Sequence, residues 1–280
     1  MKNRKKIIFA IHPLTWVLAG ISFMTGQFTS FFLLMSIIMI HEGGHILAAL
    51  WFKWDIQKVT LLPFGGKLEI KGVLDRPFSQ EVIVVLSGPF QHVVLGGLAF
   101  VYLRDWTYYS LFMQLNLQLL CFNLLPLWPL DGGRLMFLLL AKISPFAQAV
   151  KQSLVLSAVG LILTIGLALW FFSFNLQLIL LLVYVSIACY SQWRHRRILQ
   201  RQFWLERWKN NVPQTNPRVS VVQKNETIDM ILKGLKKGQP DMILIKENVR
   251  TIAMLPDQAL IHHYFTNGSP NQPVSVLLKS

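Results

Sequence analysis

The sequence predicts an α-helical membrane protein with six transmembrane helices, followed by a small cytoplasmic α/β domain. Of the 280 residues, 53% are hydrophobic and only 14% are charged, and the mean hydropathy is +0.46. These values are atypical of a soluble domain. Apolar runs of roughly 20 residues, the length of one membrane crossing, lie at about 8–26, 30–52, 80–103, 109–128, 154–174 and 176–193. We therefore expect a membrane domain at 1–193, a basic juxtamembrane linker at 194–217 and a cytoplasmic domain at 218–280.

The first run follows a basic start, MKNRKK, in an order shared by signal peptides and first transmembrane helices. No small-x-small cleavage site follows cleanly, so we interpret the run as an uncleaved span. Basic residues then gather on one side of the predicted topology, near residues 2–6, 53–76, 142–151 and 194–197, whereas the other side carries only Arg104. The positive-inside rule places both termini in the cytoplasm. The net charge of +14 is thus explained by topology and does not indicate direct nucleic-acid binding.

The second span contains the first candidate site. Residues 37–51, IIMIHEGGHILAALW, place His41, Glu42 and His45 inside an apolar run. Residues four apart share a helix face, so the two imidazoles converge on one point with Glu42 beside them. Because ionisable side chains are costly at membrane depth, a run that carries three of them predicts a functional site. The spacing is the zinc-binding HExxH pattern.

Two features separate this span from the fourth. Residues 59–74 alternate apolar and polar side chains after Gly65-Gly66, which predicts either a short hairpin whose edge can pair with an extended peptide or an ordinary amphipathic loop. The third span carries Ser87-Gly88-Pro89 and then His92, and its small residues favour close packing against the second span. We favour packing or contact with a ligand for His92 over a role as a fourth ligand.

The fourth span is interrupted at residues 122–135, FNLLPLWPLDGGRL. Broken helices are tolerated at membrane depth where they line a cavity. Asp131 can cap a helix over 132–143, but an intramembrane carboxylate beside two prolines favours a metal ligand. Asn123 can donate hydrogen bonds to a substrate, and Arg134 is expected at the cytoplasmic rim.

The sequence of residues 218–280, the tail, predicts a small α/β unit with strands at RVSVV and DMILIKE and helices at ETIDMILKGLKKG and DQALIHHYF. His262 and His263 are expected at its surface. At roughly 60 residues the unit is small for independent stability. We therefore expect it to associate with a second copy of itself.

These residues define a chemistry. Catalytic zinc usually has three protein ligands and an open position for water. His41, His45 and Asp131 supply three ligands, which leaves Glu42 free as the general base that moves a proton from water to the leaving amine. Cys121 and Cys189 form no CxxC pair. We predict one Zn²⁺ per chain and hydrolysis of a peptide bond in the membrane.

The motifs resemble those of the site-2 protease family of intramembrane zinc metalloproteases, peptidase family M50B. HEGGH matches the family's HExxH, and NLLPLWPLDGG matches its Asn-Pro-Asp-Gly segment. Within the family, LLPFGG, SGPFQH and FNLLPLWPLDGG are similar to the stage IV sporulation protein FB branch. The resemblance implies that Asn123 and Pro129 position the substrate. Many members carry Asn where this chain has His92.

The resemblance also implies partners. The expected substrate is a membrane-associated protein like pro-sigma-K, and inhibitory membrane proteins would hold the protease silent on the mother-cell side of the forespore membrane. The tail is similar to a single CBS domain, which implies a role in sensing ATP. It has no glycine-rich nucleotide signature, so nucleotide binding would require a homo-oligomer.

Two other classes fit some of these observations. A metal-ion or proton transporter also places His and acidic residues in the membrane, but transporters usually carry internal repeats, and none is evident between the two halves of the sequence. An inactive relative would be marked by loss of the general base, and Glu42 is present.

Overall fold

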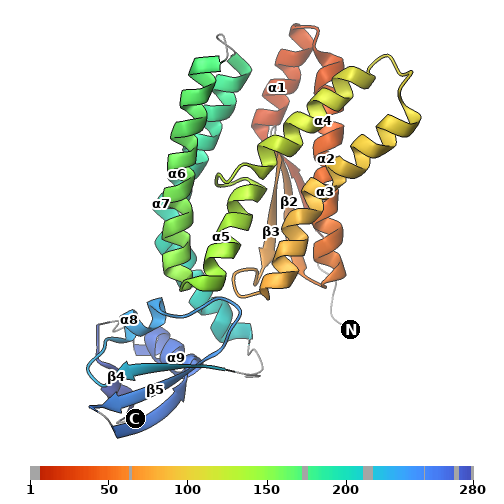
Figure 1. The fold of residues 1–280 in the computed structure, drawn as a ribbon. Coiled ribbons are helices and arrows are strands. Elements are labelled where there is room, and N and C mark those ends of the chain that lie inside the picture. Colours follow the sequence, from red (N-terminus) through yellow and green to blue (C-terminus); the bar gives the residue numbers. More distant parts are fainter. Residues whose placement is uncertain are drawn as a thin grey trace.

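The computed structural model describes residues 7–62, 65–171, 176–210, 217–248, 250–267 and 271–278. The expected basic start at 1–6 and residues 211–216 of the expected linker lie outside this part. Figure 1 shows a group of long helices around a small sheet, with the tail packed beneath one end of the group.

The helical group comprises β1 (Ile8–Ile11), α1 (Pro13–Met24), α2 (Phe28–Trp51), β2 (Asp55–Leu62), β3 (Gly65–Lys71), α3 (Phe78–Tyr102), α4 (Tyr109–Leu124), α5 (Asp131–Ile143), α6 (Phe146–Phe171) and α7 (Leu176–Asn210). The tail comprises β4 (Arg218–Gln223), α8 (Ile228–Lys233), β5 (Asp241–Glu247), β6 (Arg250–Pro256), α9 (Asp257–Asn267) and a 3-10 helix, η1 (Val274–Leu278).

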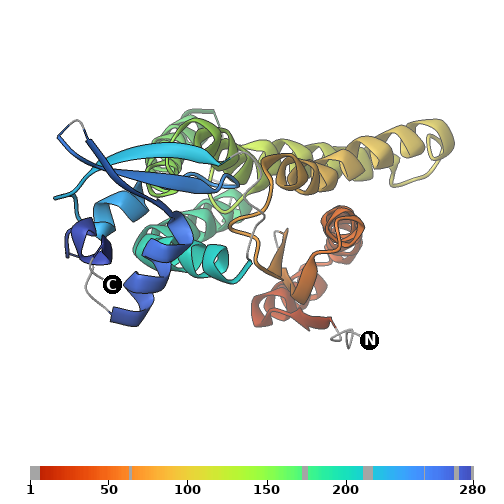
Figure 2. The same ribbon diagram turned by 90° about the horizontal axis from the view of Figure 1, so that it is seen from below.

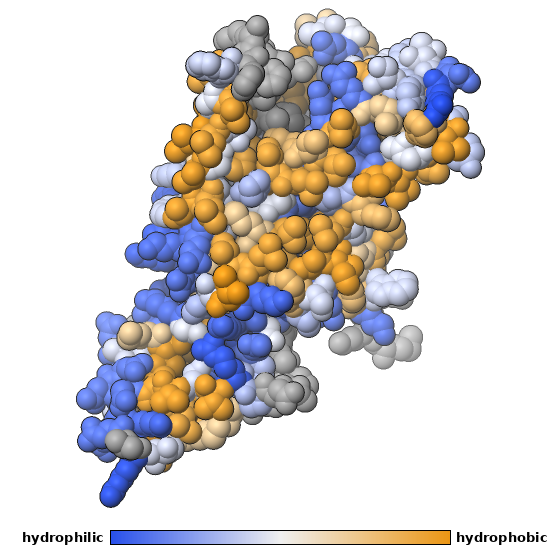
Figure 3. All heavy atoms as spheres, viewed as in Figure 1, coloured by the Kyte–Doolittle hydropathy of each residue, from blue (hydrophilic) through white to orange (hydrophobic). Residues whose placement is uncertain are grey.

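Three helices of the described chain are long and apolar enough to cross a bilayer, at Phe28–Trp51, Phe78–Tyr102 and Phe146–Trp170. Apolar residues cover much of the helical group in Figure 3, whereas hydrophilic residues gather where the tail joins it. This distribution is typical of a membrane protein with a polar domain at one end. The six-span layout and the cytoplasmic position of both termini stay predictions.

Two expected spans differ in the structure. At 8–26, residues Ile8–Ile11 form a strand parallel to β2, and the following helix α1 has only 12 residues. A four-residue apolar run fits a strand as well as a helix, and the distant β2 decides between them. The expected span at 109–128 ends at Leu124 because Pro126 and Pro129 follow it closely.

The hairpin alternative for residues 59–74 is confirmed. β2 and β3 pair antiparallel in a sheet of order β1-β2-β3, so β3 is an edge strand. Ile56 and Val59 of β2 are buried together with Ala49 of α2 and Val84 of α3. The sheet therefore lies against the two helices that frame the HEGGH motif.

The tail sheet has the order β4-β5-β6. Alternate residues of β5, Ile243 and Ile245, are fully buried together with Ile228 of α8 and Leu260 of α9. The strands expected at RVSVV and DMILIKE are present, and β6 is an additional strand. The expectation of two surface histidines is wrong for His263, which is buried, whereas His262 is exposed.

The tail shares one apolar core with the helical group. Phe146 of α6 and Phe203 of α7 belong to one buried cluster with Ile243 and Leu260 of the tail, and the Trp204 indole of α7 donates to the carbonyl of Leu232 in α8 at 3.1 Å. α7 continues through residue 210, so much of the expected linker is helix. Figure 2 shows the tail sheet lying across the ends of α5 and α6, away from α1 and α2.

Candidate metal centre

The two motif histidines lie one turn apart on the buried side of α2. The Nε2 atoms of His41 and His45 are 3.1 Å apart. Asp131, the first residue of α5, places Oδ2 at 3.2 Å from His41 Nε2 and 3.3 Å from His45 Nε2. The structure thus brings together three side chains that the sequence separates by as many as 90 positions, and all three are largely buried.

A broken segment between α4 and α5 brings Asp131 to this position. Gly133 packs closely against it, because a Cβ there would lie 2.5 Å from the carbonyl carbon and oxygen of Leu127. The helix-capping alternative for Asp131 does not apply, since Leu130 is the N-cap residue and no side chain caps the helix. The Asp131 carboxylate is therefore available to bind a metal ion.

The hydrogen bonds of His45 determine its tautomer. Its Nδ1 lies 2.7 Å from the carbonyl oxygen of Val84. A carbonyl only accepts, so Nδ1 carries the hydrogen and the lone pair of Nε2 faces His41 and Asp131. Orientation of a metal-binding histidine by such a bond is typical of metal centres.

Glu42 lies beside His41, His45 and Asp131 but is not one of the side chains whose ligand atoms converge. It is 6% exposed, and Gly66 of β3 packs against it so tightly that a Cβ at Gly66 would lie 2.5 Å from Glu42 Oε2. The hairpin and the HEGGH helix therefore meet at this carboxylate. Only a residue without a side chain fits at position 66.

α3 closes the other side of the cluster. A Cβ at Gly88 would lie 2.5 Å from Cε1 of His45 and 2.8 Å from Cε1 of His41. One turn further along, the ring of His92 lies 4.9 Å from the ring of His41 between centroids. His92 does not belong to the group of three whose ligand atoms lie within 4.8 Å of one another, which fits contact with a ligand rather than a fourth ligand.

The partner of His92 is Asn116 of α4, a buried residue that sequence reasoning missed. The Asn116 amide nitrogen donates to the His92 carbonyl at 2.8 Å, which fixes the orientation of the amide. Its oxygen then accepts from His92 Nδ1 at 2.8 Å. A neutral His92 therefore carries its hydrogen on Nδ1, and its buried Nε2 has no hydrogen-bond partner among the described residues. Sequence reasoning missed Asn116 because nothing in the residues around it in the sequence indicates contact with His92 on another helix.

The remaining predicted residues lie around this centre. Asn123 is buried near the end of α4, and Pro129 lies in the segment before α5. Arg134 was expected at the rim; its side chain is about one-third exposed and lies 3.8 Å from Glu81 Oε2.

The cluster fits a zinc ion. Two imidazole nitrogens and a carboxylate oxygen converge within 3.3 Å, and His41 Nδ1 and Asp131 Oδ2 have no hydrogen-bond partner in the described part of the chain. Lone pairs in this arrangement repel unless a proton or a metal cation lies between them. Tetrahedral zinc with bonds of about 2.0–2.1 Å separates its ligand atoms by about 3.3 Å. The observed triangle agrees with this geometry.

Comparison with known proteins supports the same assignment. Residues 29–108 and 104–167 match the model of Peptidase family M50. The chain is 31% identical to Stage IV sporulation protein FB of Bacillus subtilis over 96% of its own length and 95% of the relative. It is 28% identical to a zinc metalloprotease of Methanocaldococcus jannaschii over 64% of this chain and 54% of that protein.

A solved structure agrees as well. The site-2 protease from Methanocaldococcus jannaschii superposes with a TM-score of 0.55 and 25% identity, covering 66% of this chain and 90% of that one. With HEGGH on an apolar helix and a carboxylate from a distant segment beside it, the chain belongs to peptidase family M50, the site-2 protease family of intramembrane metalloproteases.

Proposed function

We propose that this chain is a zinc endopeptidase that cleaves a membrane-associated protein, with His41, His45 and Asp131 as ligands and Glu42 as general base. The observation that carries the proposal is the buried triangle of ligand atoms with Glu42 beside it. A bound zinc ion would supply Lewis acidity, which acidifies water and polarises the scissile carbonyl.

The protein residues have separate tasks in this proposal. His45 is held by the Val84 carbonyl, and Asp131 is held by its place at the start of α5. Glu42 accepts the proton of the attacking water and passes it to the departing amine nitrogen. Burial of this group of residues excludes bulk solvent and so strengthens the electrostatic interactions among them. Asn123 and Pro129 are proposed to position the substrate.

The edge strand β3 supports an extended substrate. β2 pairs with one side of β3, which leaves the other side as the sheet edge. An extended peptide that added to this edge would form main-chain hydrogen bonds. Gly66 of β3 lies against Glu42, so a peptide bound there would run close to the general base.

Similarity to Stage IV sporulation protein FB over nearly the whole chain supports a sporulation substrate. We propose that the substrate resembles pro-sigma-K, that inhibitory membrane proteins act on the protease, and that it works on the mother-cell side of the forespore membrane. These partners follow from the similarity alone.

The tail carries a surface that supports association with a second copy. Val219, Val221, Ile252 and Met254 project from one face of the tail sheet and are 41–55% exposed. The opposite face packs on α8 and α9. An exposed apolar sheet face is typical of an interface, so we propose a homo-oligomer through the tail, with ATP as a candidate ligand of the paired CBS-like units.

The decisive experiment compares wild type, Glu42→Gln and Asp131→Ala, each co-expressed with a pro-sigma-K-like substrate. Glu42→Gln should retain zinc and lose cleavage, because the amide cannot accept the proton. Asp131→Ala should lose both, because it removes a ligand. Cleavage by Glu42→Gln at the wild-type rate would overturn the role of Glu42, and full zinc content in Asp131→Ala would overturn the ligand set.

A further inference from the structure

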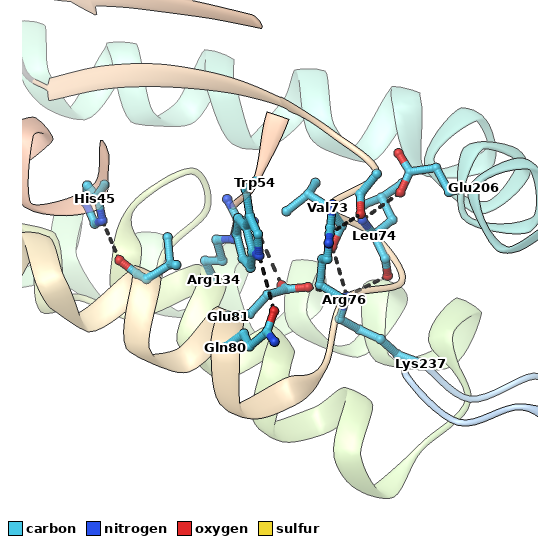
Figure 4. Close-up of polar contacts among 12 residues, drawn as sticks. His45, Trp54, Val73, Leu74, Arg76, Gln80, Glu81, Arg134, Glu206 and Lys237 are labelled. Atoms are coloured by element: carbon cyan, nitrogen blue, oxygen red, sulfur yellow. Dashed lines mark hydrogen bonds and ion pairs between the residues drawn. The ribbon is translucent and has the colours of Figure 1, made fainter. Parts of the chain in front are cut away.

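An ion pair lies between the tail and the helical group. Nζ of Lys237, in the segment between α8 and β5, is 2.5 Å from Oε1 of Glu81 in the first turn of α3. The two side chains are only 4% and 3% exposed. Lys237 also donates to the carbonyls of Leu74 at 2.5 Å and Val73 at 3.3 Å. Figure 4 shows these groups around the start of α3.

Lys237 is thus a buried cation held by one carboxylate and two carbonyls. Burial lowers the pKa of its ammonium group, and the carboxylates of Glu81 and Asp75 oppose that shift. Desolvation offsets much of the attraction in a buried ion pair, so such a pair adds little net stability, whereas removal of one partner leaves an uncompensated charge. The pair therefore constrains the position of the groups that it joins.

On the α3 side, the constraint leads to the metal cluster. Glu81, Val84 and Gly88 lie three and four residues apart and are all buried on α3, so they share one helix face. Val84 orients His45 through its carbonyl, and Gly88 touches both motif histidines. Glu81 and Gly88 are seven positions apart, which corresponds to about 10 Å of helix.

A second route leads through α5. Nη2 of Arg134 lies 3.8 Å from the other oxygen of Glu81. Arg134 is three residues after Asp131 and therefore on the same side of α5. Glu81 thus links α3 with α5: it lies about one helical turn before Val84, which orients His45, and its partner Arg134 lies about one turn after Asp131.

Two further hydrogen bonds hold the segment between β3 and α3, one to α7 and one to the tail. Glu206 of α7 accepts from the amide of Leu74 at 2.7 Å, and Asp75 accepts from the amide of Gly238 at 3.1 Å. The pKa of the Glu206 carboxyl is raised because of its burial. The segment that enters α3 is consequently fixed from the tail and from α7 together.

We propose that Lys237 is a positioning residue for the metal centre: through Glu81 it sets how α3 lies against α5, and so aligns His45 with Asp131. The inference rests on the proposed function, because it assumes that these residues bind the metal. It assigns the tail a direct part in the geometry of the site, in addition to any partner that the tail binds.

The test is the zinc affinity of the full-length protein in detergent, measured by competition with a chromophoric chelator. In Lys237→Met we expect the zinc dissociation constant to rise about tenfold, the range seen when the partners of metal ligands are altered. The visible spectrum of the Co²⁺-loaded protein should change as well, because the coordination geometry changes. Lys237→Arg keeps the charge and should restore most of the affinity.

The matched control is Lys224→Met, which breaks an exposed tail ion pair with Glu247 and should leave zinc affinity and the Co²⁺ spectrum unchanged. If Lys237→Met does not fold, the double variant Lys237→Met/Glu81→Gln, which removes both charges of the buried pair, replaces it with the same expected loss of affinity. The proposal would be overturned if the variant that folds, Lys237→Met or the double variant, bound zinc as tightly as Lys224→Met does.

The outcome is separable from that of the proposed function. If wild type binds no more zinc than Asp131→Ala, the ligand set fails, and the positioning role fails with it. If wild type binds zinc and the Lys237 variants match the control, only the positioning role of Lys237 is wrong.

Discussion

Gly88 lies on α3 directly against the two histidines of the proposed metal centre, and Gly88→Ala tests the geometry most sharply. The new Cβ would lie 2.5 Å from His45 Cε1, whereas ordinary contact begins at 3.4 Å. Because His45 Nε2 would lie closer still, the imidazole would have to retreat by at least about 0.9 Å, far beyond the tolerance of about 0.2 Å on a zinc–ligand distance. The variant should therefore lose His45 as a productive ligand.

Loss of a ligand should cost more than the roughly 10–100-fold that follows when only a ligand's partner is changed. We expect zinc affinity to fall at least about 100-fold, and cleavage to fall with it because misplacement by 1 Å costs about 10²-fold. Gly97→Ala on the same helix is the control, because a Cβ there meets no atom within 4 Å. Zinc content and substrate cleavage are measured for both variants. Equal zinc affinity in the two would refute the packing of Gly88 against the histidines.

Two further variants test whether Glu42 acts separately from the proposed metal ligands and whether Asn116 stabilises His92. Gly66→Ala should displace the Glu42 carboxyl and lower kcat while zinc affinity stays near wild type. The control is Gly43→Ala, which has open space around its Cβ and should change neither kcat nor zinc affinity. Loss of zinc in Gly66→Ala would contradict the separation of Glu42 from the ligands. Asn116→Leu removes two buried hydrogen bonds to His92, so at about 1 kcal/mol each it should lower the unfolding free energy by about 2 kcal/mol, and a thermal melt identical to wild type would count against the pair.

The HEGGH helix could be predicted because its signal is local. An apolar run with ionisable residues four apart specifies the helix and the shared face together, and the structure places both imidazoles as expected. Asp131 could be predicted because two prolines and two glycines mark a broken segment at membrane depth. The hairpin after Gly65-Gly66 was open to two interpretations, and its burial against α2 and α3 decides between them.

Other features depend on contacts that no local pattern announces. The strand at Ile8–Ile11 forms because β2, some 50 residues later, offers a parallel partner. His263 is buried because α9 packs between the tail sheet and α7, which a pair of adjacent histidines does not indicate. The burial of Lys237 could not be predicted from its neighbours in the sequence, because its carboxylate partner Glu81 lies 156 positions earlier.

These long-range contacts converge on one stretch of chain. Residues 65–81 begin with Gly66 against the Glu42 carboxyl and end with Glu81 paired to Lys237. A displacement of the tail would therefore reach Glu42, the proposed general base, through β3 and the proposed metal ligands through α3. Because the two routes leave the same segment in different directions, the proposed roles predict different signatures: variants at the β3 end should change kcat at constant zinc affinity, whereas variants at the α3 end should change zinc affinity itself.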